Sequence, residues 1–489
     1  MCRYNVRFRI YLSVLTVVFG VFSYLTSVYD VATLFAEMMI EMTANSIIFT
    51  LWLNPPYEIY LKFYLFNVTN VEEFLNYDDK KLMLNEVGPY TYRQFIYNKN
   101  VSFEDDGTLT FTPTRKIAFV PELSVGNPIT DALLVPNLPL LGITASLDEY
   151  SMAFKLAIAQ IASMLDSKSF VNVSVEEYLF GYDDTLVALA NNLLPNWIDF
   201  GRFGIIDRLM ALENGTSVVN VLVAKRGNKT LYNIEKFNGE FGLAQWGHAS
   251  ECYSLNDLLF IGTVFPPKLE ENSSLILYSH AFCRPLPVKF NKSDSSKYGF
   301  DAYTFNIENN KFLARGSEYD CSSDTIRRTL PNGIGYISPC YYDMPFAVSQ
   351  PHFLNADSNT MSEKIDGMKP DPAMHDFYLT IHPTSGLPLE AKMRLQINLC
   401  MPYTRFNSRT KPFNDLILPL FWVEQSVDGP PTLIYISMYF LYVILPVAQE
   451  LVKYMLMIIT TICFVALVYT VLSCGARESY AQVNVNEVN

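Results

Sequence analysis

Signatures of catalysis are missing from this sequence. It contains no G-x-S-x-G nucleophile elbow, no H-E-x-x-H metal motif, no Walker loop and no G-x-G-x-x-G fingerprint. Only five histidines occur and no two are four residues apart, which excludes a pair of metal ligands on one helical face. The sequence also lacks C-x-x-C, the usual zinc spacing. We therefore predict a protein that is not an enzyme and that uses no cofactor or metal.

Positive charge is also scarce. Lys and Arg number 36 against 49 Asp and Glu, a formal net charge of −13. A nucleic-acid partner requires a basic surface, so this class of ligand is excluded. Charged residues make up only 17% of the chain and hydrophobic residues 50%. The chain is therefore more hydrophobic than an ordinary soluble protein.

The excess apolar residues are concentrated in long uncharged runs near the two ends. Residues 10–29 and 454–474 carry no charge, and about twenty helical residues span the ~30 Å hydrocarbon core of a bilayer. Three arginines and no acid precede the first run, which predicts that residues 1–9 stay cytoplasmic. A cleaved signal peptide is the alternative, but its apolar core is usually only about 7–15 residues and ends at an A-x-A site, which is missing.

A third uncharged stretch, residues 429–449, precedes the second run. If it also crossed the membrane, only residues 450–453 would remain to turn a helical hairpin, and they contain no glycine. We predict instead that residues 429–453 form a juxtamembrane segment, lying on the membrane or packed under the ectodomain. Residues 475–489 then form a cytoplasmic tail, and both termini are cytoplasmic.

The intervening residues, 30–428, have features of an exoplasmic ectodomain. All the N-x-[ST] sequons lie there and none lies in the short tails, which predicts N-glycosylation. Four of the five ectodomain cysteines fall within ninety residues, as expected of disulfides in an oxidising compartment. The odd number predicts one free thiol. The predicted glycosylation sites are Asn67, Asn100, Asn172, Asn214, Asn228, Asn272 and Asn291.

Most of the ectodomain has strand-like patterns. Residues 57–67 and 391–399 alternate polar and apolar side chains, which is typical of half-buried antiparallel strands, and residues 217–225 and 274–282 are also strand-like. Capping-box spacing predicts helices after Thr69 and after Ser174. Residues 150–165 are apolar on nearly every face; a buried core helix is our main interpretation, and cover by membrane or ligand is the alternative. The prediction is an α+β fold.

Several segments, in order along nearly the whole chain, resemble the class B scavenger receptor family. They include NEVGPYTYRQ at 85–94, SQPHFLNAD at 349–357, IDGMKPD at 365–371 and PLFWVE at 419–424. The resemblance implies a large antiparallel β-barrel ectodomain with a helical bundle at its membrane-distal apex and an internal apolar tunnel. It also implies that Cys252 pairs with Cys321 and Cys283 with Cys340. Ser323 stands where larger members start a third bridge. We expect residues 88–90, Gly-Pro-Tyr, to form a sharp turn between two strands.

The function that the resemblance implies is that of a lipid receptor. Such a receptor binds fatty acids, phospholipids, sterols, lipoproteins or apoptotic-cell lipids and passes them through the tunnel to the membrane. Exposure of an acyl chain to water costs ~0.8 kcal/mol per CH₂, which explains the need for a covered path. The alternative is a trafficking or adhesion receptor that binds a protein through the apical helices.

The apex predicted from residues 150–165 and 174–194 is acidic, and Lys155 and Lys168 are its candidate ligand-binding cations. In the tail, Tyr480 and Val483 fit the sorting motif that adaptor proteins read for endocytosis. The expected location is the plasma membrane, with endosomes or lysosomes as the alternative.

Overall fold

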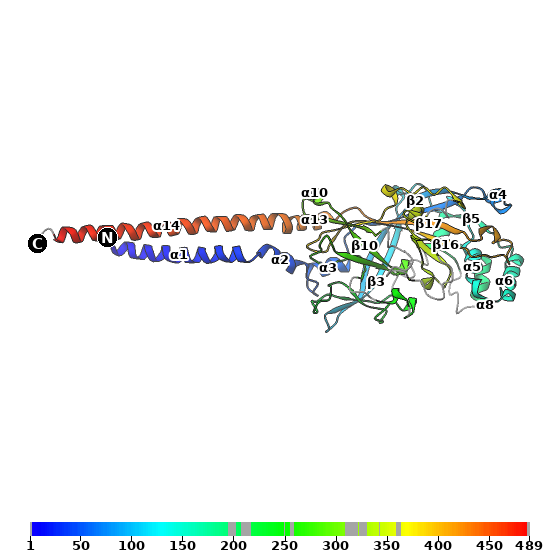
Figure 1. The fold of residues 1–489 in the computed structure, drawn as a ribbon, viewed down its shortest axis with the longest axis horizontal. Helices are drawn as coiled ribbons and strands as arrows, with labels where there is room; N and C mark the ends of the chain where they lie inside the picture. Colours follow the sequence, from blue (N-terminus) through cyan, green and yellow to red (C-terminus); the bar gives the residue numbers. More distant parts are fainter. Residues whose placement is uncertain are drawn as a thin grey trace. The chain divides into compact units, whose positions relative to one another are not determined.

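The computed structural model describes residues 2–193, 202–206, 217–248, 250–254, 259–308, 321, 330–341, 343–357 and 363–486. The chain divides into two compact units. The helical unit combines Met1–Glu41 with Thr432–Asn489, and the barrel unit is Met42–Pro431. Figure 1 shows the fold.

The helical unit is built from two long helices that lie side by side. Its elements are α1 (Cys2–Val28), α2 (Val31–Ile40), α13 (Thr432–Tyr439), a π-helical turn (Phe440–Ile444) and α14 (Leu445–Asn486). At one end Arg9 Nη2 donates to the Thr470 carbonyl at 2.6 Å, and at the other Ala32 N–H donates to Gln449 Oε1 at 2.7 Å. The helices are therefore antiparallel, and the two chain ends lie on the same side of this unit.

Both helices are long and apolar enough to cross a membrane, over Val6–Val28 and within Thr432–Ser473. The predicted juxtamembrane segment is helical from Thr432 onward and continues without a turn into the predicted second span. The π-helical turn ends two residues before Pro446, where a proline without an N–H would otherwise interrupt an α-helix. Residues 450–453 lie inside α14, where Glu450 and Lys453 bond to each other at 3.0 Å. The helix is continuous at this point, so no hairpin forms there.

The barrel unit is dominated by one large, mostly antiparallel sheet that curls into a nearly closed barrel (Figure 1). Its main path runs β7-β6-β3-β2-β1-β17-β16-β15-β11-β10-β9-β8. The strands of this sheet are β1 (Ile59–Val68), β2 (Leu82–Phe103), β3 (Thr108–Phe119), β6 (Val219–Leu222), β7 (Ile234–Phe237), β8 (Leu259–Phe260), β9 (Ser274–Ser279), β10 (Arg284–Ser293), β11 (Tyr303–Ile307), β12 (Ile334–Tyr336), β13 (Phe346–Ser349), β14 (Ile365–Asp366), β15 (Tyr378–Ile381), β16 (Pro388–Cys400) and β17 (Ile417–Val427). A separate pair joins β4 (Ala132–Pro136) to β5 (Phe170–Ser174).

The alternation of polar and apolar residues in the sequence explains which side chains of the central strands are buried. In β1, Leu61, Phe63 and Leu65 are buried, whereas Lys62 and Tyr64 between them are only half-buried. This period of two places one row of side chains in the barrel interior and the other row on its outer face. The four strands predicted from sequence are confirmed as β1, β6, β9 and β16.

The predicted turn at Gly88-Pro89-Tyr90 is wrong. These residues lie inside β2, where the register between β1 and β2 shifts at Phe63 and Leu65. A Cβ on Gly88 would lie 2.7 Å from the Phe63 carbonyl oxygen. The glycine therefore allows close approach of two paired strands at a bulge, not a reversal of the chain.

The helices of the barrel unit gather mainly at one end. Figure 1 shows α5, α6 and α8 together at the end opposite α3 and α10; α5, α6 and α8 are named the helical end below. The bounds are α3 (Ile47–Leu53), α4 (Val71–Leu75), α5 (Leu138–Ser146), α6 (Met152–Met164), α7 (Val175–Phe180), α8 (Thr185–Leu193), α10 (Ser295–Tyr298) and α12 (Pro372–His375).

The two predicted helix caps have different outcomes. Ser174 and Glu177 form a complete capping box at the start of α7, as predicted. Thr69 does not cap α4, because the cap position is Asn70. The Asn70 side chain instead donates to Asp79 and Lys81 and accepts the Met83 N–H at 2.8 Å. It ties α4 to β2, a long-range role that sequence spacing does not reveal.

The buried core helix expected over residues 150–165 is also wrong. Only Ala162 of α6 is fully buried, whereas Met152, Leu156 and Met164 are 60%, 51% and 77% exposed. The helix packs by one narrow stripe against α5 and α8. The helix buried on all sides is α5, whose residues from Leu138 to Ala145 are buried throughout.

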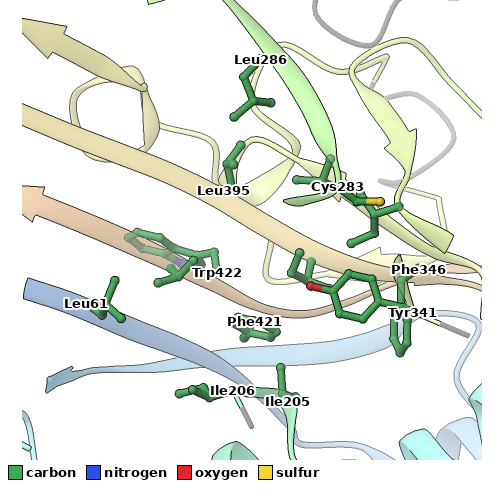
Figure 2. Packing of buried hydrophobic residues seen from close by; sticks show 14 of the residues in the cluster. Leu61, Ile205, Ile206, Cys283, Leu286, Tyr341, Phe346, Leu395, Phe421 and Trp422 are labelled. Atoms are coloured by element: carbon green, nitrogen blue, oxygen red, sulfur yellow. The ribbon is translucent and has the colours of Figure 1, made fainter. Parts of the chain in front are cut away.

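Apolar side chains fill the described part of the barrel interior. Figure 2 shows Leu61 and Phe421 from neighbouring strands near Ile205 and Ile206. Disulfides join Cys252 to Cys321 and Cys283 to Cys340, the pairs that the resemblance implies. Cys400 is buried in β16 outside any disulfide. Ser323 lies outside the described residues.

Candidate functional site

Among the described residues, a serine and a histidine that lie close together have the geometry of a turn. Ser385 Oγ lies 2.8 Å from His382 Nδ1, which also accepts the Ser385 backbone N–H at 3.2 Å. Burial lowers the pKa of His382 to about 4, so the imidazole is a poor base at neutral pH. Among the described residues, no group of three His, Cys, Asp or Glu side chains could hold a metal ion.

An apolar pocket between α3 and the β3–β6 part of the sheet is the candidate ligand site. It is small and narrow, with a cavity volume of about 20 Å³. Most of the lining is aliphatic or aromatic, and Tyr232 and Thr263 supply hydroxyls. Apolar walls with a few polar groups suit an acyl chain and its head. The lining residues are Met42, Trp52, Leu109, Phe111, Val221, Val223, Tyr232, Ile261, Thr263 and Val264.

The α3 wall of this pocket is held firmly on the sheet. Asn98 of β2 donates its amide to the Trp52 carbonyl at 2.8 Å. The Trp52 ring packs edge-on against Phe111 of β3, with 4.6 Å between ring centroids, and Phe49 contacts Phe103 at 5.2 Å. The described residues show this pocket and not the continuous tunnel that the resemblance implies.

The two predicted ligand-binding lysines have different surroundings. The Lys155 ammonium donates to the Asp148 carbonyl at 2.6 Å and lies 5.7 Å from the centroid of the Phe406 ring. Its side chain is only 13% exposed, so local contacts occupy it. Lys168 is exposed directly after α6. Because its side chain is exposed, Lys168 is the better placed of the two to meet a ligand. No contact between the two lysines is seen among the described residues.

Two arginines at the helical end were missed by the sequence reasoning. Arg409 donates to the Ser167 carbonyl at 2.7 Å and pairs with Asp166 at 3.2 Å, which brings the segment before β17 beside the end of α6. Arg405 is exposed on the same segment and lies over the Tyr403 ring. The surface of the helical end is therefore less acidic than the charged residues within 150–194 alone indicated. No local signal could have placed a segment about 240 residues away.

Most of the asparagines predicted to be glycosylated are exposed. Asn67 differs, because it is half-buried in β1 and its Oδ1 accepts the Leu134 N–H at 2.8 Å. Asn214 lies outside the described residues. The exposed sequon asparagines are Asn100, Asn172, Asn228, Asn272 and Asn291.

The comparison with known families covers most of both spans and the whole barrel unit. A family model described as CD36 family matches residues 11–471. The chain belongs to the CD36 family. Scavenger receptor class B member 1 of Cricetulus griseus is 30% identical over 421 residues, which are 86% of this chain and 80% of the relative. Lysosome membrane protein 2 of Homo sapiens is 28% identical over 394 residues, 80% of this chain and 79% of the relative.

Membership of the CD36 family confirms the class B scavenger receptor resemblance read from the motifs. It identifies a membrane protein with two terminal spans and both termini in the cytoplasm, in agreement with the antiparallel helices of the helical unit. It also implies a receptor for lipids or lipoproteins. In this CD36-family chain, the apolar pocket is a candidate for contact with such a ligand.

Proposed function

We propose that this CD36-family protein binds a lipid with a long acyl chain in its barrel unit and passes it to the membrane. The observation that carries the proposal is the apolar pocket behind α3, with its two hydroxyl-bearing side chains. Met42 contributes to the lining, and only α2 separates it in sequence from the first span, Val6–Val28. One lining residue of the pocket therefore lies shortly after the membrane helix in the sequence.

The transfer step follows from the cost of exposing hydrocarbon. Each CH₂ that leaves an apolar surface for water costs ~0.8 kcal/mol, so a sixteen-carbon chain that crosses water unprotected faces roughly 12 kcal/mol. A path through the barrel avoids this cost. The packed interior requires side chains such as Phe421 to move aside as the lipid passes.

The proposal predicts saturable binding of a fluorescent long-chain fatty acid or phospholipid to the full chain in nanodiscs. The substitution Thr263→Trp, at the half-buried rim of the pocket, is expected to exclude about two CH₂ groups. That loss is ~1.6 kcal/mol, or more than tenfold in affinity.

The matched control is Thr130→Trp, at an exposed threonine outside the pocket, which should leave the affinity unchanged. Thermal unfolding verifies that both variants are folded. Unchanged affinity in Thr263→Trp would remove the pocket from the account, and no saturable binding across a broad lipid panel would remove the function.

A receptor for a protein partner is the second candidate. The exposed Met152, Leu156 and Met164 of α6 favour it, because apolar side chains on a helix surface are typical of protein interfaces. The exposed Lys168 adds charge beside this surface. In this case Lys168→Glu should abolish capture of the partner and leave lipid binding intact, whereas the lipid receptor predicts no dependence on α6.

A further inference from the structure

Four of the sequence motifs meet on the outer face of the barrel. Glu86 comes from NEVGPYTYRQ in β2, His352 from SQPHFLNAD and Trp422 from PLFWVE in β17. The IDGMKPD motif belongs to residues 363–377, named the cover segment here, which also contains His375. Trp422 lies opposite Tyr64 and Gln396 in the strand register, on the face away from the interior.

The cover segment is fixed to the sheet at both ends. Its β14 pairs with the start of β2, and a Cβ on Gly367 would lie 2.1 Å from the Leu84 carbonyl oxygen. At the other end, Arg394 of β16 donates to the Asp376 carbonyl at 3.0 Å, and Asn306 of β11 donates to the Asp376 carboxylate at 2.8 Å. In the middle of the segment, Lys369 is bound by His352, which lies outside it, and Asp371 is bound by His375 within it.

The hydrogen bonds define the protonation state of the His375 ring. His352 Nδ1 accepts the Lys369 N–H at 3.1 Å, and His375 Nδ1 accepts the Asp371 N–H at 2.9 Å. A nitrogen that accepts carries no proton, so the His375 imidazole is neutral and carries its proton on Nε2. His352 Nε2 lies 2.6 Å from Glu86 Oε2, which also accepts the Trp422 indole N–H at 2.7 Å.

The two rings are also stacked. Their centroids are 4.3 Å apart, and the side chains are only 5% and 7% exposed. A proton on His375 Nδ1 would point one N–H at another and break the bond that closes the turn of the cover segment from Asp371 to His375. It would also place a positive charge within a buried ring pair, next to His352. The closed arrangement thus requires a neutral His375.

We propose that the stacked His352 and His375 form a latch with His375 as its acid-sensitive member, which holds the cover segment on the barrel at neutral pH and releases it in an acidified compartment. The latch acts on β1 and β17, the first strand after one membrane helix and the last before the other. The charged groups around it are Glu86 of β2, Lys62 of β1, Arg394 of β16, Glu424 of β17, and Lys369, Asp371 and Asp376 of the cover segment.

The direction of the pH effect follows from His375. Burial, with the neighbouring His352 and Arg394, lowers its pKa from 6.5 to about 4, although Glu86 and Asp371 act the other way. Above pH 6.5 the ring is neutral whether the cover segment is closed or open. Below it the open form binds the proton first, so the closed form weakens by about tenfold per pH unit down to about pH 4.

Hydrogen exchange of the full chain in nanodiscs tests the latch. After correction for intrinsic rates, protection of amides in the cover segment should fall tenfold or more between pH 6.5 and pH 5, while amides of β10 and β11 in the same sample change little. His375→Asn retains an oxygen near Nδ1 to accept the Asp371 N–H but cannot be protonated, so this pH dependence should disappear. The control His248→Asn, at an exposed histidine, should retain it.

A second variant covers the case in which His375→Asn is unstable. His375→Phe preserves the stacked ring and removes the acceptor, so the cover segment should already exchange at least tenfold faster at pH 7.5. The latch is contradicted if protection of the wild-type cover segment is independent of pH, or if its fall persists in His375→Asn.

Discussion

The substitution Glu424→Gln is expected to lower the free energy of unfolding by about 3–5 kcal/mol, the usual cost of removing one partner from a buried charge pair. Glu424 Oε2 lies 2.7 Å from Arg394 Nε, and its Oε1 lies 2.9 Å from Lys62 Nζ. The Glu424 and Arg394 side chains are only 5% and 7% exposed. Glutamine removes the charge that compensates Arg394 and turns an NH₂ toward one of the two donors.

The pH dependence has a defined sign. Burial alone would raise the pKa of Glu424, but hydrogen bonds from Lys62 and Arg394 outweigh it and hold the pKa below its usual 4.5. The stabilisation is therefore present above pH 4.5 and is lost as the pH falls through the lowered value. Thermal or denaturant unfolding of the full chain in detergent measures the effect.

The matched control is Glu308→Gln. Glu308 pairs with Lys289 at 2.6 Å, but the lysine side chain is 48% exposed. A pair open to solvent contributes about 0–1 kcal/mol. Equal destabilisation of the two variants would contradict the role of burial in this ion-pair group.

The substitution Trp422→Ala is also expected to lower the free energy of unfolding by about 3–5 kcal/mol, because it removes a fully buried aromatic side chain. Trp422 is 1% exposed and stacks on Tyr64, with 3.8 Å between centroids and 3° between ring planes. Its indole N–H is also one of the two donors to Glu86.

The substitution Trp422→Phe separates packing from hydrogen bonding. Phenylalanine retains most of the ring contact but leaves the Glu86 carboxylate with one donor fewer, a loss of about 1–3 kcal/mol. The same unfolding measurement should thus rank Trp422→Ala well below Trp422→Phe. Two variants of similar stability would show that the hydrogen bond dominates and that ring packing contributes little.

Local patterns were sufficient where an element depends on its own residues. The two spans were read from uncharged length, β1 and β16 from alternation, and the capping box at Ser174 from spacing. The motif order was sufficient to recognise the family. These signals are short-range, and the structure retains them.

Long-range contacts explain the errors. Thr69 has the right spacing for a cap, but Asn70 is bound to Asp79 and Lys81. The apolar α6 was expected in the core, yet α5 occupies the buried position beneath it. A single sequence does not show which residues of two strands pair, so the bulge at Gly88 could not be derived. It also does not show that the segment around Arg409 lies beside the end of α6.

The candidate site, too, could be predicted only in part, because its position depends on long-range contacts. The sequence predicted an apolar lipid site from the family resemblance, but the pocket is assembled from α3, β3, β6 and the residues after β8. These segments are far apart in the chain and none carries a local mark of ligand binding. The motifs served to recognise the family, and the structure brings Glu86, His352 and Trp422 from three of them together as a polar group.

Photo-crosslinking with a diazirine-bearing long-chain fatty acid tests the central claim most directly. The full chain in nanodiscs is irradiated with the probe, and the modified residues are identified by mass spectrometry. The account predicts labelling of residues lining the pocket, such as Ile261 and Val264, which excess unlabelled fatty acid suppresses and Thr263→Trp abolishes. Labelling confined to the membrane helices α1 and α14, and unaffected by competitor, would contradict a lipid site inside the barrel unit.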